Sequence, residues 1–342
     1  MGIVDIIIEI ITWPPLWQLI VLGLIAPLAV VIGILWFERK TAGRVQRRFG
    51  PLHVSPRIGG AFQLIADLMR YAFQEIIIPK TVDRAAFLLA PLTALVVSIV
   101  PLVAVPFTSI PKWWPIPMEY SVLISLALST VSAIFIVIAG WASNNKFSII
   151  GGLREAYMIT AYELIVILSI LSTSAMVLSY NFVDIVNAQV GGKWFIIMNP
   201  LAFLAAFIGV LMSTSGFPFE IPESEHEVVA GPFTEYSGLL YGINMGAAYI
   251  KRFVYSVFVT LAFLGGWLPY HPGPGFISGY LLPSIVIIVK ATILMAIFSF
   301  FRSVYGRYRL DQALDLAWKM LFPLAILGFG LGIWEAYIGL IG

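Results

Sequence analysis

Runs of apolar residues recur along the chain, and each is long enough to cross a lipid bilayer. A membrane-spanning helix needs about 20 mostly apolar residues, because the hydrocarbon core is roughly 30 Å thick. By this criterion the sequence predicts eight spans, at about Leu16–Phe37, Ala85–Phe107, Tyr120–Gly140, Thr160–Tyr180, Phe195–Ser215, Leu239–Gly265, Tyr280–Phe301 and Lys319–Ile338. The predicted fold class is therefore an all-α polytopic membrane protein with eight transmembrane helices.

The polar segment after the first span contains a further helical pattern, at residues 59–75. Apolar residues recur there at the spacing of one helix face, and polar residues lie elsewhere around the helix. We predict an amphipathic helix that lies at the membrane surface or covers a cavity. We find no segment typical of a soluble domain, so residues 1–342 are predicted to form a single membrane domain.

Composition narrows the chemistry that this membrane domain can perform. The chain is 60% hydrophobic and only 11% charged, whereas soluble domains contain about 25% charged residues. It has no cysteine, which excludes disulfides, iron–sulfur ligation by this chain and cysteine-based zinc sites. His53, His226 and His271 lie too far apart in the sequence for a metal-ligand motif. We therefore expect that this chain binds no metal and no cofactor of its own.

Basic residues are distributed unevenly between the polar segments. Residues 38–84 contain nine Lys or Arg, whereas the segments on the opposite side contain only Lys112 and Lys193. Cytoplasmic loops are enriched in Lys and Arg. The asymmetry thus predicts a multi-pass protein of the cell membrane with both termini extracytoplasmic. The predicted cytoplasmic loops are about residues 38–84, 141–158, 216–237 and 302–318.

One of these loops is strongly acidic and has no Lys or Arg. From Pro218 to Gly238 it reads PFEIPESEHEVVAGPFTEYSG, with carboxylates at Glu220, Glu223, Glu225, Glu227 and Glu235. Pro222 suits the first position of a short helix over residues 222–230, which would place Glu223 in the first turn. Carboxylates this close raise one another's pKa values, so the loop can hold protons near neutral pH. The alternative is a solvated acidic loop.

Charged residues also lie inside the predicted spans. They are Glu163 in the fourth span, Lys251 and Arg252 in the sixth, and Lys290 in the seventh. A charge in hydrocarbon is costly, so each should face the bundle interior, water or a partner charge. We predict that these residues take part in ion movement. The alternatives are structural ion pairs and side chains that extend to the membrane surface.

Six stretches, in order along the chain, match the pattern of one family. Besides the acidic loop they are ERKTAGRVQRRFGP (38–51), LIADLMR (64–70), AGWASNNKFSIIGGLR (139–154), VKATILM (289–295) and RYRLDQALDLAWKMLFPL (307–324). Together they resemble the NuoH-type membrane subunit of respiratory complex I, over essentially the whole chain. The family extends to subunits of membrane-bound hydrogenases, sulfane reductases and dehydrogenases that oxidise a reduced deazaflavin coenzyme.

The resemblance implies a membrane anchor that joins a peripheral electron-transfer arm to an ion-pumping membrane arm. It implies eight spans, two of them strongly tilted. The implied partners are peripheral subunits with Fe–S clusters or a NiFe-site-like fold, antiporter-like membrane subunits, and lipid. In quinone-reducing members the NuoH-type protein forms much of the quinone chamber, which would bring quinone to the interface. No nucleic-acid partner is expected, because the basic loop is short and adjoins the membrane.

The resemblance also implies roles for individual residues. It assigns ion coupling to the five loop glutamates, Glu163 and Lys290, and the charge and position of Glu155, Lys251 and Arg252 add these three to the set. The residues assigned to the chamber or to the interface with the peripheral arm are Glu38, Arg39, Arg44, Asp67, Arg70 and Arg154.

Three positions depart from the family pattern. Ala248 stands where the family often has a glutamate in the sixth span, Ser213 stands where quinone-reducing members can have a carboxylate, and Glu155 is an added acid. These departures favour a ferredoxin-linked, archaeal-type complex, either a hydrogenase or a sulfur-reducing enzyme. The alternative within the family is a quinone-reducing NuoH-type subunit.

In either case we expect a subunit of a translocating oxidoreductase that contains no redox centre, so the isolated chain should catalyse nothing. Two interpretations from other classes stay open. A secondary transporter would show repeat symmetry and broken helices near the bilayer midplane. A purely structural anchor would tolerate free replacement of the loop glutamates.

Overall fold

The computed structural model describes residues 17–339, and every regular element in that range is a helix. The α-helices, in chain order, are α3 (Ala26–Val45), α4 (Gln63–Phe73), α5 (Arg84–Ile99), α6 (Ser121–Ala142), α7 (Lys146–Val177), α8 (Phe182–Ala188), α9 (Phe195–Met198), α10 (Pro200–Ser213), α11 (Glu225–Val228), α12 (Gly238–Phe263), α13 (Leu282–Val304), α14 (Leu310–Leu316) and α15 (Phe322–Ile338). Further helical turns precede α3, α13 and α15, at Trp17–Ile25, Ile277–Leu281 and Ala317–Leu321.

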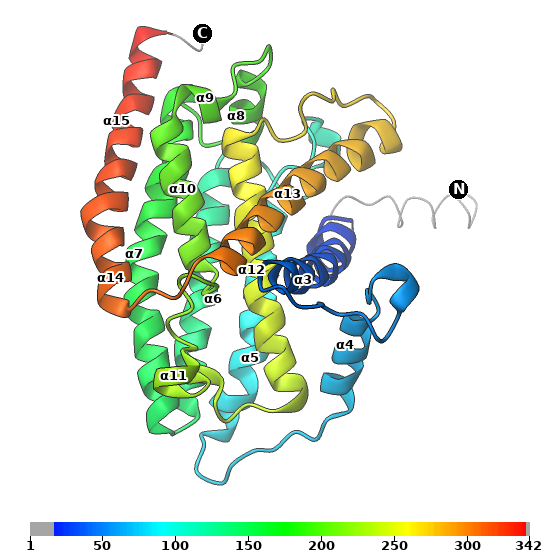
Figure 1. Cartoon of the computed structure of the whole chain (residues 1–342). Coiled ribbons are helices and arrows are strands. Elements are labelled where there is room, and N and C mark those ends of the chain that lie inside the picture. Colours follow the sequence, from blue (N-terminus) through cyan, green and yellow to red (C-terminus); the bar gives the residue numbers. More distant parts are fainter. Residues whose placement is uncertain (1–16, 340–342) are drawn as a thin grey trace.

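Seven helical segments of the described chain have the length and apolar composition to cross a membrane. They are Ile20–Val45, Arg84–Ala104, Ser121–Ala142, Lys146–Val177, Gly238–Phe263, Ile277–Val304 and Leu310–Ile338. The most buried of them is α12, which packs against α3, α4, α5, α10 and α13, while α13 runs obliquely across the bundle in Figure 1. The prediction of an all-α polytopic membrane protein is confirmed. The predicted start of the first span, Leu16, lies outside the described residues.

The fifth predicted span differs from the expected continuous helix over Phe195–Ser215. The structure divides it into α9 and the 14-residue α10, interrupted at Asn199. The cause is Pro200, which lacks a backbone N–H and disfavours a helical conformation in the residue before it. Asn199 stabilises the break, because its side chain accepts a hydrogen bond from the Ala202 N–H and donates one to the Gly328 carbonyl of α15.

The predicted loop at residues 141–158 is mostly helix. α7 begins at Lys146, where the Asn145 side chain caps it by accepting from the Phe147 N–H, and runs for 32 residues. Arg154 and Glu155 therefore lie on a helix that continues into the fourth span. The sequence suggested a loop because these charges interrupt the apolar run. In the fold each charge has a partner, so the helix does not need to end.

Two other predicted loops are also shorter than expected. α3 continues to Val45, so Glu38 and Arg39 are helical residues rather than loop residues. α13 ends at Val304 and α14 begins at Leu310, which leaves a loop of residues 305–309. The predicted amphipathic helix is confirmed as α4. It packs beside α3 and α12, burying Leu64 and leaving most of its other apolar side chains exposed.

The acidic loop contains a shorter helix than the predicted 222–230. Its α-helical turn, α11, follows Ser224 and ends where Val229 adopts a φ of 63°. Pro222 is therefore outside the helix, and Glu223 precedes it instead of lying in its first turn. As a result Glu223 and Glu227 do not share a helix face. We call the end of the bundle that carries residues 214–237 the acidic end (Figure 1).

Candidate functional site

Glu38 of α3 is a buried carboxylate that forms ion pairs with two arginines near the acidic end. Arg252 of α12 lies 3.3 Å from it, and Arg302 of α13 contacts its other oxygen. The hydroxyls of Tyr249 and Ser299 also donate to it, at 3.1 and 3.3 Å. Charge-assisted hydrogen bonds of this kind are roughly twice as strong as those between neutral groups. We call these five residues the Glu38 cluster.

Arg302 connects the Glu38 cluster to the acidic loop. It lies 3.6 Å from Glu220, which also contacts Arg307 at 2.7 Å. Arg307 in turn donates to the Ser224 hydroxyl at 2.9 Å. The loop has no Lys or Arg in its own sequence, but α13 and the segment after it supply the cations. One loop carboxylate is thus linked to Glu38 through a single shared guanidinium.

A second group of buried charges lies between α7 and α12. Lys251 lies 3.4 Å from Glu163 and donates to the Tyr162 hydroxyl at 3.1 Å. Tyr162 donates to Glu155 at 3.0 Å, and the Tyr255 hydroxyl lies 2.9 Å from both oxygens of Glu163. All five side chains are buried. We call them the Glu163 cluster.

The charges of the Glu163 cluster do not balance when every group is ionised. Glu155 and Glu163 share one ammonium, that of Lys251. An uncompensated charge in the interior is costly and is commonly removed by protonation. Two carboxylates that share one cation therefore form a place where an exchangeable proton can reside. The sequence predicted Glu155 and Glu163 on nearby helix faces, and the structure brings them together.

Glu223 differs chemically from the other loop carboxylates. It is half-buried beside the acidic end, and burial followed by the neighbouring charges of Glu220 and Glu155 raises its pKa to about 8. Glu223 is thus the loop carboxyl that holds a proton at neutral pH. The sequence predicted that the loop could hold protons but did not indicate which residue would do so.

The remaining loop carboxylates have separate environments. Glu225 is exposed, and Glu227 pairs with Arg154 of α7. Glu235 accepts a hydrogen bond from Asn145 at 2.5 Å. Arg154 and Asn145 both come from the start of α7, so these contacts fasten the acidic loop to that helix.

Lys290 joins neither cluster. Its ammonium donates to the backbone carbonyls of Leu264, Gly266 and Leu268, at 2.6, 2.9 and 2.6 Å, and lies over the Trp194 ring. These carbonyls belong to the C-terminal end of α12 and the turn after it. The last carbonyls of a helix have no partner within the helix. Lys290 therefore caps α12 at the end of the bundle opposite the acidic loop.

A cavity of about 290 Å³ lies between α3, α4 and α12. Its apolar wall is formed by Leu28, Val31, Ile32, Leu35, Leu64, Leu68 and Met245, and its polar groups are Glu38, Arg39, Asp67, Tyr71, Tyr249 and Arg302. Arg39 and Asp67, both assigned to the chamber from the sequence, form an ion pair at 2.5 Å. Arg70 lies over the Tyr71 ring, whereas Arg44 is exposed at the end of α3. The Glu38 cluster thus borders an apolar space.

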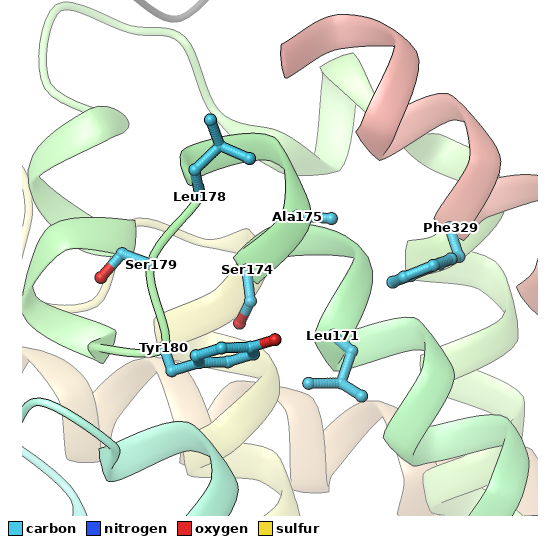
Figure 2. A pocket seen from close by; sticks show the side chains of 7 residues that line it. All are labelled: Leu171, Ser174, Ala175, Leu178, Ser179, Tyr180 and Phe329. Carbon is cyan, nitrogen blue, oxygen red and sulfur yellow. The ribbon is translucent and has the colours of Figure 1, made fainter. Parts of the chain in front are cut away.

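A second cavity, of about 310 Å³, shares no lining residue with the first (Figure 2). It is formed where α7 ends beside Phe329 of α15, with the ring of Tyr180 on one side, and has no charged residue in its lining. It therefore offers no ion chemistry. In the described part of the chain, no group of three or more His, Asp or Glu is placed to hold a metal ion.

Several residues of the two clusters were missed in the sequence. Tyr162, Tyr249 and Tyr255 looked like ordinary aromatic residues of a span, and Arg302 was placed only at the start of the predicted cytoplasmic loop 302–318. One signal was present: Tyr162 directly precedes Glu163, and Tyr255 follows Lys251 by one helical turn.

Comparison with known proteins agrees with this arrangement. The family model described as NADH dehydrogenase matches residues 17–332. The chain is 37% identical to the H subunit of the NADH-quinone oxidoreductase of Geobacillus thermodenitrificans, over 87% of this chain and 89% of that protein. The chain belongs to the NADH dehydrogenase family. The corresponding protein of Carboxydothermus hydrogenoformans, 36% identical over 94% of this chain and 90% of that protein, is a similar relative.

Family membership makes this chain a complex I-like membrane subunit of an oxidoreductase. It does not support the ferredoxin-linked, archaeal-type prediction, because the relatives named above are quinone oxidoreductase subunits from bacteria. They favour the quinone-reducing alternative. The prediction drawn from the departures at Ala248, Ser213 and Glu155 is thus not supported by these relatives. Of the three, Glu155 belongs to the buried Glu163 cluster, and none of them lines the apolar cavity.

Proposed function

We propose that this chain forms the quinone chamber of an NADH-quinone oxidoreductase and couples quinone reduction to ion movement. The observation that carries the proposal is the cavity between α3, α4 and α12, whose polar groups are shared with the Glu38 cluster. An apolar wall suits a lipid-soluble quinone ring and tail, and a few polar groups at one side orient its carbonyls. The cavity offers Tyr71, Tyr249 and the Arg39–Asp67 pair for this purpose.

Quinone reduction adds two electrons and two protons, and converts both carbonyls of the ring to hydroxyls. The electrons would come from Fe–S clusters in peripheral partner subunits, including one with a NiFe-site-like fold. The acidic end would face those subunits and the cytoplasm, with both chain termini extracytoplasmic. Antiporter-like membrane subunits would receive the electrostatic change that quinone reduction produces. The positive loops and the acidic loop on one end support this orientation.

The coupling would be electrostatic. A charge change in the cavity acts first on Glu38 and Arg302, because both line it, and then on Arg252, because it pairs with Glu38. Arg302 is shared with Glu220, so a change at Glu38 alters the field at Glu220 and at the protonated Glu223 beside it. Interactions at these distances are strong in a low-dielectric interior.

Gly246→Phe tests the chamber. Gly246 lines the cavity, and no atom lies within 4 Å of a Cβ built there, so the new ring would enter open space. We expect NADH-driven quinone reduction in membranes to fall by about ten-fold, which corresponds to about 1.4 kcal/mol of lost binding. NADH oxidation by ferricyanide, which reports electron entry upstream, should not change.

The matched control is Gly33→Phe, a helical glycine on α3 with equally open surroundings and exposed outside the cavity. It should leave quinone reduction unchanged. Normal quinone reduction by an assembled Gly246→Phe complex would contradict the chamber assignment.

A further inference from the structure

A single turn of the chain touches both charge clusters. It consists of Ser215 and Gly216, which follow Thr214, the residue that caps the C-terminal end of α10. The Ser215 hydroxyl donates to Glu155 Oε2 at 3.1 Å, while Tyr162 donates to the other oxygen of that carboxylate. Gly216 is buried against Arg252: a Cβ atom at this position would lie 2.6 Å from the arginine Nη2. The turn therefore contacts the Glu163 cluster on one side and the Glu38 cluster on the other.

The backbone of the turn is specialised for this contact. Ser215 has a φ of 44°, in the left-handed region that residues other than glycine rarely adopt. Such conformations persist only where the surrounding structure holds them, and they concentrate at functional sites. Gly216 has no side chain, so the guanidinium of Arg252 can lie directly on the turn. A larger residue there would displace it.

Arg252 is held in a way that allows it to respond to Glu38. Among the described residues, its side-chain hydrogen bond goes to Glu38, and its Nε atom is buried without a partner. Arg302 competes for the same carboxylate. A charge change at Glu38 therefore changes the electrostatic force on the Arg252 guanidinium. The side chain can shift in response, whereas the helical backbone of α12, which also carries Lys251, stays in place.

We propose that the Ser215–Gly216 turn transmits charge changes from the Glu38 cluster to the Glu163 cluster, with Ser215 as a positioning residue that acts through Glu155. The inference rests on the proposed function. When Arg252 shifts against Gly216, the turn moves and the hydrogen bond from Ser215 to Glu155 lengthens or shortens. A hydroxyl that donates to a carboxylate favours its ionised form. Movement of the turn therefore changes the electrostatic balance between the Glu155 and Glu163 carboxylates around Lys251.

Ser215→Gly tests the link in the intact complex, in sealed membrane vesicles. Glycine adopts the left-handed conformation without strain, so this variant removes the hydroxyl and keeps the backbone. We expect quinone reduction to persist while the number of ions moved per electron falls by about three-fold or more. Ser215→Asn should restore much of the ratio, because asparagine tolerates positive φ and carries a donor. Redox-induced infrared spectra of Ser215→Gly should lose the carboxyl band that is also lost in Glu155→Gln.

Ser213→Ala is the control, since the Ser213 hydroxyl donates to Val210 within its own helix. It should keep the wild-type ratio. The inference would be overturned if Ser215→Gly kept the wild-type number of ions moved per electron and an unchanged infrared band. The proposed function would still stand in that case, provided that Glu163→Gln is uncoupled. If the wild-type vesicles themselves reduce no quinone, the proposed function fails instead.

Discussion

At the scale of single residues, Glu223 has the most distinctive chemistry of the acidic loop. Its pKa is raised from 4.5 to about 8, chiefly by burial. The folded protein therefore keeps a proton that the unfolded chain releases at lower pH. By linkage, the contribution of Glu223 to stability is fully present below the unfolded pKa and declines as the pH rises through about 8.

We predict that pH-dependent infrared spectra will contain a protonated-carboxyl band that disappears with a midpoint near pH 8. This band should be absent from Glu223→Gln and present in Glu225→Gln, which alters an exposed carboxylate of the same loop. A band that persists in Glu223→Gln would assign the proton to a different group.

Residue burial could be predicted from the sequence, but residue pairing could not. The cost of charge in hydrocarbon correctly predicted that Glu163, Lys251 and Arg252 face the interior. Lys251 and Arg252 point about 100° apart on α12, and they enter different clusters for that reason. Their partners, Glu163 and Glu38, are 88 and 214 residues away in the sequence. No local pattern reports contacts at such separations.

At the scale of elements, apolar runs located the spans but not their ends. α7 begins well before the predicted Thr160, because Glu155 and Arg154 are satisfied by partners from other elements. α10 is shorter than predicted, because Pro200 ends the preceding turn. The first discrepancy needed tertiary contacts to be seen. The second was present in the sequence as an Asn-Pro pair inside an apolar run.

Lys290 supports a prediction about the end of α12. Lys290→Met removes the ammonium from three backbone carbonyls, and each unsatisfied acceptor costs about 1–3 kcal/mol. We expect a clear loss of thermal stability in the purified protein or complex, measured by the melting temperature in detergent. Thr292→Val on the same helix is the control, since that hydroxyl donates to Ile288 within α13. An unchanged melting temperature together with fewer ions moved per electron would instead favour the ion-coupling role that the sequence suggested for Lys290.

At the scale of the whole molecule, the central helix organises the site. α12 carries Tyr249 and Arg252 toward the Glu38 cluster and Lys251 and Tyr255 toward the Glu163 cluster. The family often has a glutamate at the position of Ala248, one residue before this set. In this chain the cluster carboxylates come from α3 and α7, and α12 supplies Lys251 and Arg252. The same helix thus lines the cavity and contributes to the buried Glu163 cluster.

Under the coupling proposed above, we predict that ion movement requires Glu163. In Glu163→Gln, Lys251 and Glu155 form a balanced pair, and the surplus carboxylate that can hold an exchangeable proton is lost. We predict that the complex still assembles and reduces quinone, because Glu163 does not line the cavity. The ions moved per electron should fall by about ten-fold.

Proton or sodium uptake, recorded alongside quinone reduction in sealed vesicles, measures that ratio. Glu119→Gln provides the control, since this carboxylate is exposed and outside both clusters. Full coupling in Glu163→Gln would leave the Glu163 cluster with a structural role, as an ion pair that holds α7 against α12. Loss of both quinone reduction and ion movement would mean that the two clusters and the cavity are electrostatically coupled. The charge at Glu163 would then control quinone reduction itself as well as the ion movement that follows it.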